Sequence, residues 1–113
     1  MLSYFTSVKK DYVTYAQNHL DDWRALFSVA NSFSQNCAYE EAITYWELAY
    51  QAQEKPRYTD YHGSIALCYL RLNDKANAIK AYQKVLQVLK DDWDYKFGAH
   101  VDTIKEKINK LTE

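Results

Sequence analysis

Hydrophobic, small and aromatic residues recur along the middle of the chain in one pattern that occurs twice. The first copy comprises Leu26, Val29, Ala30, Phe33, Ala42, Trp46 and Ala49, and the second comprises His62, Ile65, Ala66, Tyr69, Ala78, Tyr82 and Val85. Each member of the second copy follows its counterpart by 36 positions. Spacings of three and four residues predict amphipathic helices, and a period of this length is typical of stacked helical hairpins. We expect helices over about 22–35, 39–53, 59–72 and 75–89.

The connections around the first copy contain residues that suit helix ends. Asn36-Cys37-Ala38 is short enough to force the helices on either side of it to run antiparallel. Asn36 is the residue of the three that best tolerates a left-handed backbone, the conformation in which many helices end. Asp21 or Asp22 is expected to cap the N-terminus of the first helix in this copy. The helix over residues 59–72 is apolar nearly all round, so we expect it to be packed on several sides.

One amphipathic helix is expected on either side of the two copies. The first covers residues 3–20 and is either a capping helix or the remnant of a preceding repeat. The last covers residues 93–113. Because Asp91-Asp92-Trp93 resembles Asp21-Asp22-Trp23, we expect it to begin this last helix. The inward stripes of the two flanking helices are Phe5, Val8, Tyr12, Tyr15 and His19 in the first, and Phe97, Val101, Ile104, Ile108 and Leu111 in the last.

These elements predict an all-α fold, an antiparallel helical-hairpin solenoid of about six helices. We expect a single domain, 1–113, in which residues 23–56 form the first repeat and residues 59–92 the second. Small residues such as Ala42 let the helix axes approach each other, and large residues such as Trp46 fill the remaining space.

The pattern resembles the tetratricopeptide repeat, whose signature places a bulky residue, Leu-Gly, an aromatic residue, and then Ala and an aromatic residue at these spacings. The resemblance implies a non-catalytic interaction module with a concave groove that binds a peptide or helix of a partner protein. The groove positions it implies are Arg24, Phe27, Asn31 and Gln35 in the first repeat, Gly63, Leu67, Leu70 and Arg71 in the second, and Phe97 and Val101 in the last helix.

Two properties of these positions bear on the partner. Phe27, Leu67 and Leu70 would form an apolar floor, with Arg24 and Arg71 as a basic rim, which suits an amphipathic or extended apolar peptide. One subset of the resembled family binds heat-shock chaperones through a clamp of Lys and Asn residues. Only Asn31 matches that clamp, so we do not expect that function here.

Two alternatives to an open groove stand beside this prediction. The terminal helix could cover Leu67 and Leu70 and leave no site. The chain could also associate as a homodimer through its terminal helices. It holds eleven tyrosines, and those that the core does not need, such as Tyr45, Tyr50 and Tyr95, favour an interface.

Composition narrows the classes of partner. The chain has 14 basic and 15 acidic residues, so we expect no nucleic-acid partner, since nucleic-acid binders normally carry a basic stripe. The absence of a long apolar run or a signal-peptide layout predicts no membrane partner. Two cysteines, Cys37 and Cys68, are fewer than a small secreted domain carries, and they indicate reduced thiols in the cytoplasm.

Candidate chemistry is sparse. His19, His62 and His100 lack metal-ligand spacing, and we expect His62 and His100 to be packing residues. Paired carboxylates such as Glu40-Glu41 lie at predicted helix starts, where the helix dipole explains them. The chain has no glycine-rich phosphate loop and no nucleophile elbow. We therefore expect no catalytic residue, no metal and no cofactor, and we predict that the chain is not an enzyme.

Overall fold

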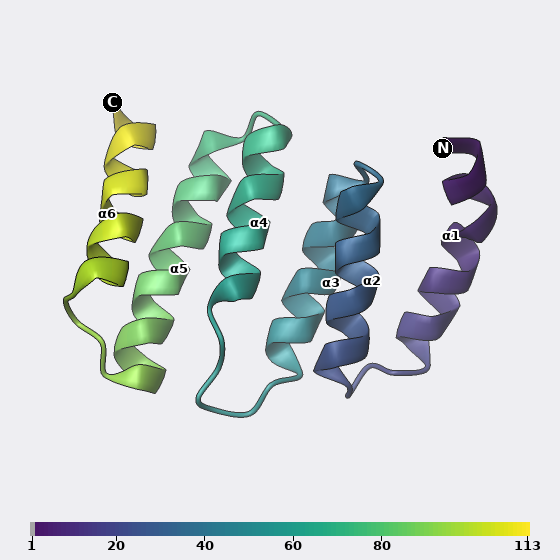
Figure 1. Cartoon of the computed structure of the whole chain (residues 1–113), viewed down its shortest axis with the longest axis horizontal. Helices are drawn as coiled ribbons and strands as arrows, with labels where there is room; N and C mark the ends of the chain where they lie inside the picture. Colours follow the sequence, from purple (N-terminus) through teal and green to yellow (C-terminus); the bar gives the residue numbers. More distant parts are fainter. Residues whose placement is uncertain (1) are drawn as a thin grey trace. The chain divides into compact units, whose positions relative to one another are not determined.

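The computed structural model describes residues 2–113, which form six α-helices and no β-strand (Figure 1). The helices are α1 (Leu2–Gln17), α2 (Trp23–Gln35), α3 (Tyr39–Gln51), α4 (Asp60–Arg71), α5 (Lys75–Trp93) and α6 (Ala99–Thr112). The prediction of an all-α fold of helical hairpins is confirmed. The side chains of residues 2–7, 60 and 61 lie outside the description, and with them the predicted inward position of Phe5.

The helices form two compact units, Met1–Gln53 and Glu54–Glu113, here called unit 1 and unit 2. In unit 1, α2 and α3 make the main hairpin, and α1 packs against α2. In unit 2, α4 and α5 make the corresponding hairpin, and α6 packs against α5. That residues 1–113 act as a single domain stays a prediction.

The repeated pattern forms the core of each unit. Thirteen of its fourteen residues are buried, and Tyr69 is half-buried. The small residues are the most completely covered, since Ala30, Ala42, Ala49, Ala66 and Ala78 have no exposed surface. The small side chains therefore lie where helices approach most closely, as the sequence predicts, and each leaves no room for a larger one.

The two hairpin turns have the same geometry at equivalent positions. Cys37 and Asn73, which are 36 residues apart, both have a left-handed backbone with φ of 62°. After each of them a backbone amide bonds back to the end of the preceding helix, from Ala38 N to Phe33 O at 2.9 Å and from Asp74 N to Tyr69 O at 2.8 Å. This is the Schellman arrangement that ends many helices.

The left-handed residue of the first turn is Cys37 and not Asn36, although asparagine tolerates this conformation better. Asn36 has a φ of −99° and donates its side-chain amide to Ser32 O at 2.9 Å. Cys37 takes the left-handed conformation instead, because the Schellman bonds fix its position one residue after the helix cap. Its thiol is exposed, whereas that of Cys68 is buried.

The two Asp-Asp-Trp sequences have opposite roles. Asp22 caps α2 as predicted, and its Oδ1 accepts hydrogen bonds from Arg24 N at 3.1 Å and Ala25 N at 3.3 Å. The prediction that Asp91-Asp92-Trp93 begins the last helix is wrong, because these residues form the last turn of α5. The last helix begins at Ala99, after Gly98 with φ of 129°.

The reason is an ion pair between residues far apart in the sequence. Arg57 donates to the carboxylate of Asp92 from Nε (2.7 Å), Nη2 (2.9 Å) and its backbone N (2.8 Å). The indole Nε1 of Trp93 donates to Arg57 O at 2.7 Å. These contacts, here called the Arg57 clasp, hold the end of α5 in helical form. The hydrogen bond from the Arg57 side chain is the main reason why the pKa of Asp92 is lowered to about 2.

Candidate functional site

A groove with a volume of about 250 Å³ lies among the three helices of unit 2. We call it the α4–α6 groove. The residues that line it are Thr59, which precedes α4, Gly63, Ser64 and Leu67 from α4, Tyr82 and Val85 from α5, and His100, Ile104 and Lys107 from α6. Residues of α4 and α6 border this groove, and residues of α5 form its base. This arrangement of helices is the one expected at the concave face of a helical hairpin repeat.

The α4 side of the groove is open at Gly63 and Leu67, which lie about one helical turn apart. Gly63 has no side chain, and a Cβ atom added there would meet no heavy atom within 4 Å. Leu67 follows four residues later on the same face of the helix, and its side chain is 52% exposed. Ile65, Ala66 and Cys68 of the same helix are buried, so α4 is packed on other faces and leaves Leu67 open to the groove.

The base of the groove is apolar and closely packed. Tyr82, Val85 and Ile104 are all buried, so only their groove-facing atoms form its floor. Burial raises the pKa of the Tyr82 phenol above its ordinary value, so this group stays protonated at neutral pH. The ammonium group of Lys107 lies 5.7 Å from the centroid of the Tyr82 ring, within reach of a cation–π interaction.

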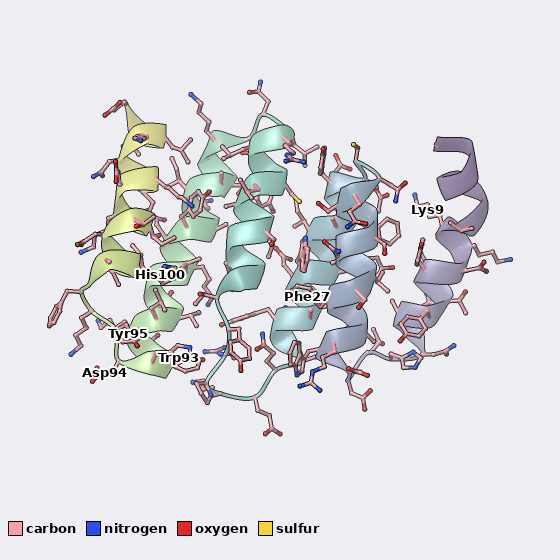
Figure 2. The ribbon with its side chains drawn as sticks, in the orientation of Figure 1. Lys9, Phe27, Trp93, Asp94, Tyr95 and His100 are labelled. Atoms are coloured by element: carbon pink, nitrogen blue, oxygen red, sulfur yellow. The ribbon has the colours of Figure 1, made fainter. Side chains whose placement is uncertain are left out.

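The rim carries one cation and small polar groups. Lys107 is exposed, and the side chains of Thr59 and Ser64 supply hydroxyl groups. His100 is exposed beside them and is labelled in Figure 2, so the expectation that it is a packing residue is wrong. Among the described residues that line the groove, none is acidic. The groove can therefore bury apolar side chains and attract a carboxylate at its edge.

The buried histidine of unit 2 is a packing residue, as predicted. His62 lies in the core, and burial lowers its pKa to about 4, with further lowering from the charges of Lys84 and Arg57. Its imidazole is therefore neutral at pH 7. Among the side chains that the structure describes, those of residues 8–59 and 62–113, no cluster of three His, Cys, Asp or Glu could hold a metal ion. No helix in this part of the chain is both long and apolar enough to cross a membrane.

Of the positions predicted in unit 2, the structure brings Gly63 and Leu67 together in the groove. Leu70 is half-buried and Arg71 is exposed in the last turn of α4, and neither lines the groove. The predicted apolar floor and basic rim of this unit are therefore replaced by Tyr82, Val85 and Ile104 below and by Lys107 at the edge.

The two positions predicted on the last helix lie elsewhere. Phe97 is 83% exposed in the segment before α6, and Val101 is buried and faces away from the groove into a second pocket. The error has one cause: α5 runs past Leu89 to Trp93, so α6 begins later and a different set of its residues borders the groove. Gly98, one of two glycines in the chain, was the signal that could have located the start of α6.

The positions predicted in unit 1 all lie on α2. Phe27, labelled in Figure 2, is half-buried. Its ring contacts that of Trp46 edge-on, with 4.7 Å between the ring centroids. Arg24 is exposed, with its guanidinium 5.0 Å from the centroid of the Trp23 ring. Asn31 and Gln35 are exposed further along the helix. That these residues bind a partner stays a prediction.

The model of a family described as "Bacterial transcriptional activator domain" matches residues 6–109. No curated protein matches the chain. The family is regulatory and non-catalytic, and its fold is helical and similar to the tetratricopeptide repeat, although the specific tetratricopeptide assignment is not confirmed.

The match contradicts our expectation of no nucleic-acid partner. Domains of this family occur in transcriptional activators, which bind DNA. The near-neutral charge describes the surface of these 113 residues alone. It gives no information about the DNA-binding activity of the activators in which such domains occur.

Proposed function

Because the chain belongs to the family of bacterial transcriptional activator domains, we propose that it is a non-catalytic regulatory module that binds a partner protein. The partner supplies a peptide or helix that docks in the α4–α6 groove. We also propose a cytoplasmic location, where a bacterial activator meets its DNA. The tetratricopeptide resemblance implies that the concave face binds a peptide, and we propose the same use for the α4–α6 groove.

The observation that carries the proposal is the exposure of Leu67 beside Gly63. A leucine that is 52% exposed next to an open helical position is apolar surface that its own unit does not cover. It faces a floor of buried side chains, so a partner side chain placed there would lose its contact with water on several sides. Apolar anchors in such a pocket supply most of the binding energy of a docked peptide.

The rim specifies the chemistry of the partner. Among the described residues that line the groove, Lys107 is the cation and none is a carboxylate. A partner helix with apolar residues at spacings of three and four, and an acidic residue beside them, complements both features. The apolar side chains would contact Leu67 and the floor, and the carboxylate would lie near Lys107.

Leu67→Glu is the variant that tests this proposal. Because Leu67 is half exposed, we expect the free energy of unfolding of the Leu67→Glu variant to stay within about 0.5 kcal/mol of that of the wild-type protein. Leu72→Glu is the matched control, since Leu72 is also exposed, follows α4 directly and does not line the groove. Proteins retained from the source lysate by wild type and by Leu72→Glu should be lost with Leu67→Glu. Retention of the same proteins by all three would refute the groove as the binding site.

A second candidate, self-association, is supported by exposed aromatic residues. Phe97 is 83% exposed and Tyr95 is 58% exposed in the segment before α6. The other two tyrosines considered for an interface have partners in the core, since Tyr50 is buried and Tyr45 stacks on Phe33 at 5.3 Å. Light scattering at micromolar concentration decides the matter. A particle of twice the 13.3 kDa chain mass that becomes monomeric with Phe97→Ser would support self-association, and a monomer would exclude it.

A further inference from the structure

A second pocket lies on the other side of the contact between α5 and α6, with a volume of about 310 Å³. We call it the lysine pocket, and it is lined by Leu86, Lys90, Tyr95, Lys96, Val101 and Lys105. On α6, Val101 and Lys105 each follow a groove residue by one position. They are therefore turned by about 100° around the helix from the groove.

Three cations surround an apolar floor in this pocket. Leu86 is half-buried and Val101 is buried, so carbon atoms form the base. Lys90, Lys96 and Lys105 are all exposed, and none of the described residues that line the pocket is acidic. Lys96 Nζ lies 3.9 Å from Asp94 Oδ1, but both side chains are exposed and such a pair contributes little.

The segment after α5 holds an aromatic ring at the rim. Asp94 has a left-handed backbone with φ of 56°, and Tyr95 N donates to Leu89 O at 2.8 Å, which ends α5 and turns the chain towards α6. Tyr95 is 58% exposed, and it is labelled in Figure 2 at the end of α5. The ring therefore offers an apolar face, with a hydroxyl group, beside the three ammonium groups.

We propose that the lysine pocket binds an acidic peptide segment of a partner protein, with one apolar side chain on Leu86 and Val101 and flanking carboxylates at the lysines. The charges favour an anion. They sit on long flexible stems, so they attract carboxylates without fixing one small molecule in a single orientation. The backbone of duplex DNA could meet the lysines, but it has no side chain to cover the apolar floor, so the peptide accounts for more of the surface.

The test uses a fluorescein-labelled peptide in which Asp and Glu flank a central Trp-Leu pair, with a second peptide that has Asn and Gln in their place. We expect binding of the acidic peptide by fluorescence anisotropy, at an affinity that falls with added salt. Lys90→Glu with Lys105→Glu should weaken it about tenfold or more. Lys75→Glu with Lys110→Glu is the matched control, because it makes the same charge change on the same two helices outside the pocket and should weaken binding less than about threefold.

Amide chemical shifts distinguish this site from the groove. Addition of the acidic peptide should shift the signals of Lys90, Tyr95 and Lys105, and leave those of Gly63 and Leu67 unchanged. If the Glu variants fail to fold, Lys90→Gln with Lys105→Gln removes the charges without reversing them, and a loss of binding is again expected. Equal binding of the two peptides, equal loss in both variant pairs, shifts confined to the groove, or displacement of the peptide by a short DNA duplex at lower concentration would each overturn the proposal.

Discussion

Asp92→Asn tests whether the Arg57 clasp holds the end of α5. The Asp92 side chain has no exposed surface and that of Arg57 is 22% exposed, so the charges are mostly shielded from water. The carboxylate accepts three hydrogen bonds from Arg57, all between 2.7 and 2.9 Å. Asparagine keeps the shape and one acceptor oxygen, but it removes the charge and the two-oxygen contact with the guanidinium.

The expected loss of unfolding free energy is about 2–3 kcal/mol, since a hydrogen bond to a charged group contributes about 1.5–3 kcal/mol and one neutral acceptor remains. In urea unfolding this corresponds to a midpoint about 1–2 M lower, for a slope typical of a small protein. Asp91→Asn makes the same charge change at the exposed neighbour and should leave the midpoint nearly unchanged. The indole signal of Trp93 should also move in Asp92→Asn, because its acceptor is the Arg57 carbonyl.

The same pair predicts a dependence on pH. Because the folded pKa of Asp92 is about 2 and its ordinary value is 3.8, the stabilisation is complete above about pH 4 and is lost as the pH falls towards 2. Asp92→Asn should lack this part of the acid sensitivity, whereas Asp91→Asn should retain it. If Asp92→Asn and Asp91→Asn unfold at the same urea concentration and with the same acid profile, the clasp does not stabilise α5.

Three further predictions concern unit 2, each measured by urea unfolding. Gly63→Ala should stabilise the protein by about 0.5–1 kcal/mol, because the added Cβ meets open space in a helix; a loss would mean that the position is crowded. Ala78→Leu should cost about 1–3 kcal/mol by overpacking a fully buried site, and an unchanged midpoint would contradict the close packing of α4 and α5. The pKa of His62 is about 4 in the folded protein, against an ordinary value of 6.5, so the unfolded chain takes up the proton first as the pH falls. The free energy of unfolding should therefore decrease as the pH drops below 6.5, and His62→Leu should remove this dependence on pH. An identical dependence on pH in the variant would refute the prediction.

The core could be predicted because buried positions recur in the sequence at helical spacing. Small residues at Ala42 and Ala78, with large ones a turn away, are readable from the letters alone, and both have no exposed surface. The left-handed residue of the first turn cannot be predicted from residue preference, because asparagine tolerates this conformation best and the Schellman hydrogen bonds nevertheless place Cys37 in it. Local preference was overridden there by the position of the helix end.

The end of α5 and the start of α6 depend on a contact that sequence periodicity does not predict. Arg57 and Asp92 are 35 residues apart, and their ion pair turns an apparent helix start into a helix end. That change moved the start of α6, and with it the side of the candidate groove that α6 supplies. Gly63 and Leu67 are positions that the tetratricopeptide resemblance implies on α4, and both line the groove. Ile104 and Lys107 also line it, but the sequence does not indicate them because they depend on where α6 begins.

The connection with DNA was missed for a different reason. The count of 14 basic and 15 acidic residues gives only the net charge of these 113 residues and does not show how the charges are distributed over the surface. Membership of a family of transcriptional activator domains describes the kind of protein in which the domain works, and net charge does not report this.

Photocrosslinking from position 67 tests the central claim most directly. The photoreactive residue p-benzoylphenylalanine replaces Leu67 in one protein and Gln87, exposed on α5 and outside the groove, in another. After irradiation in the source cells, the account predicts that position 67 is joined to one segment of a partner protein, and that position 87 is not. Crosslinks from position 67 only to other residues of the same chain, or equal labelling from both positions, would contradict it.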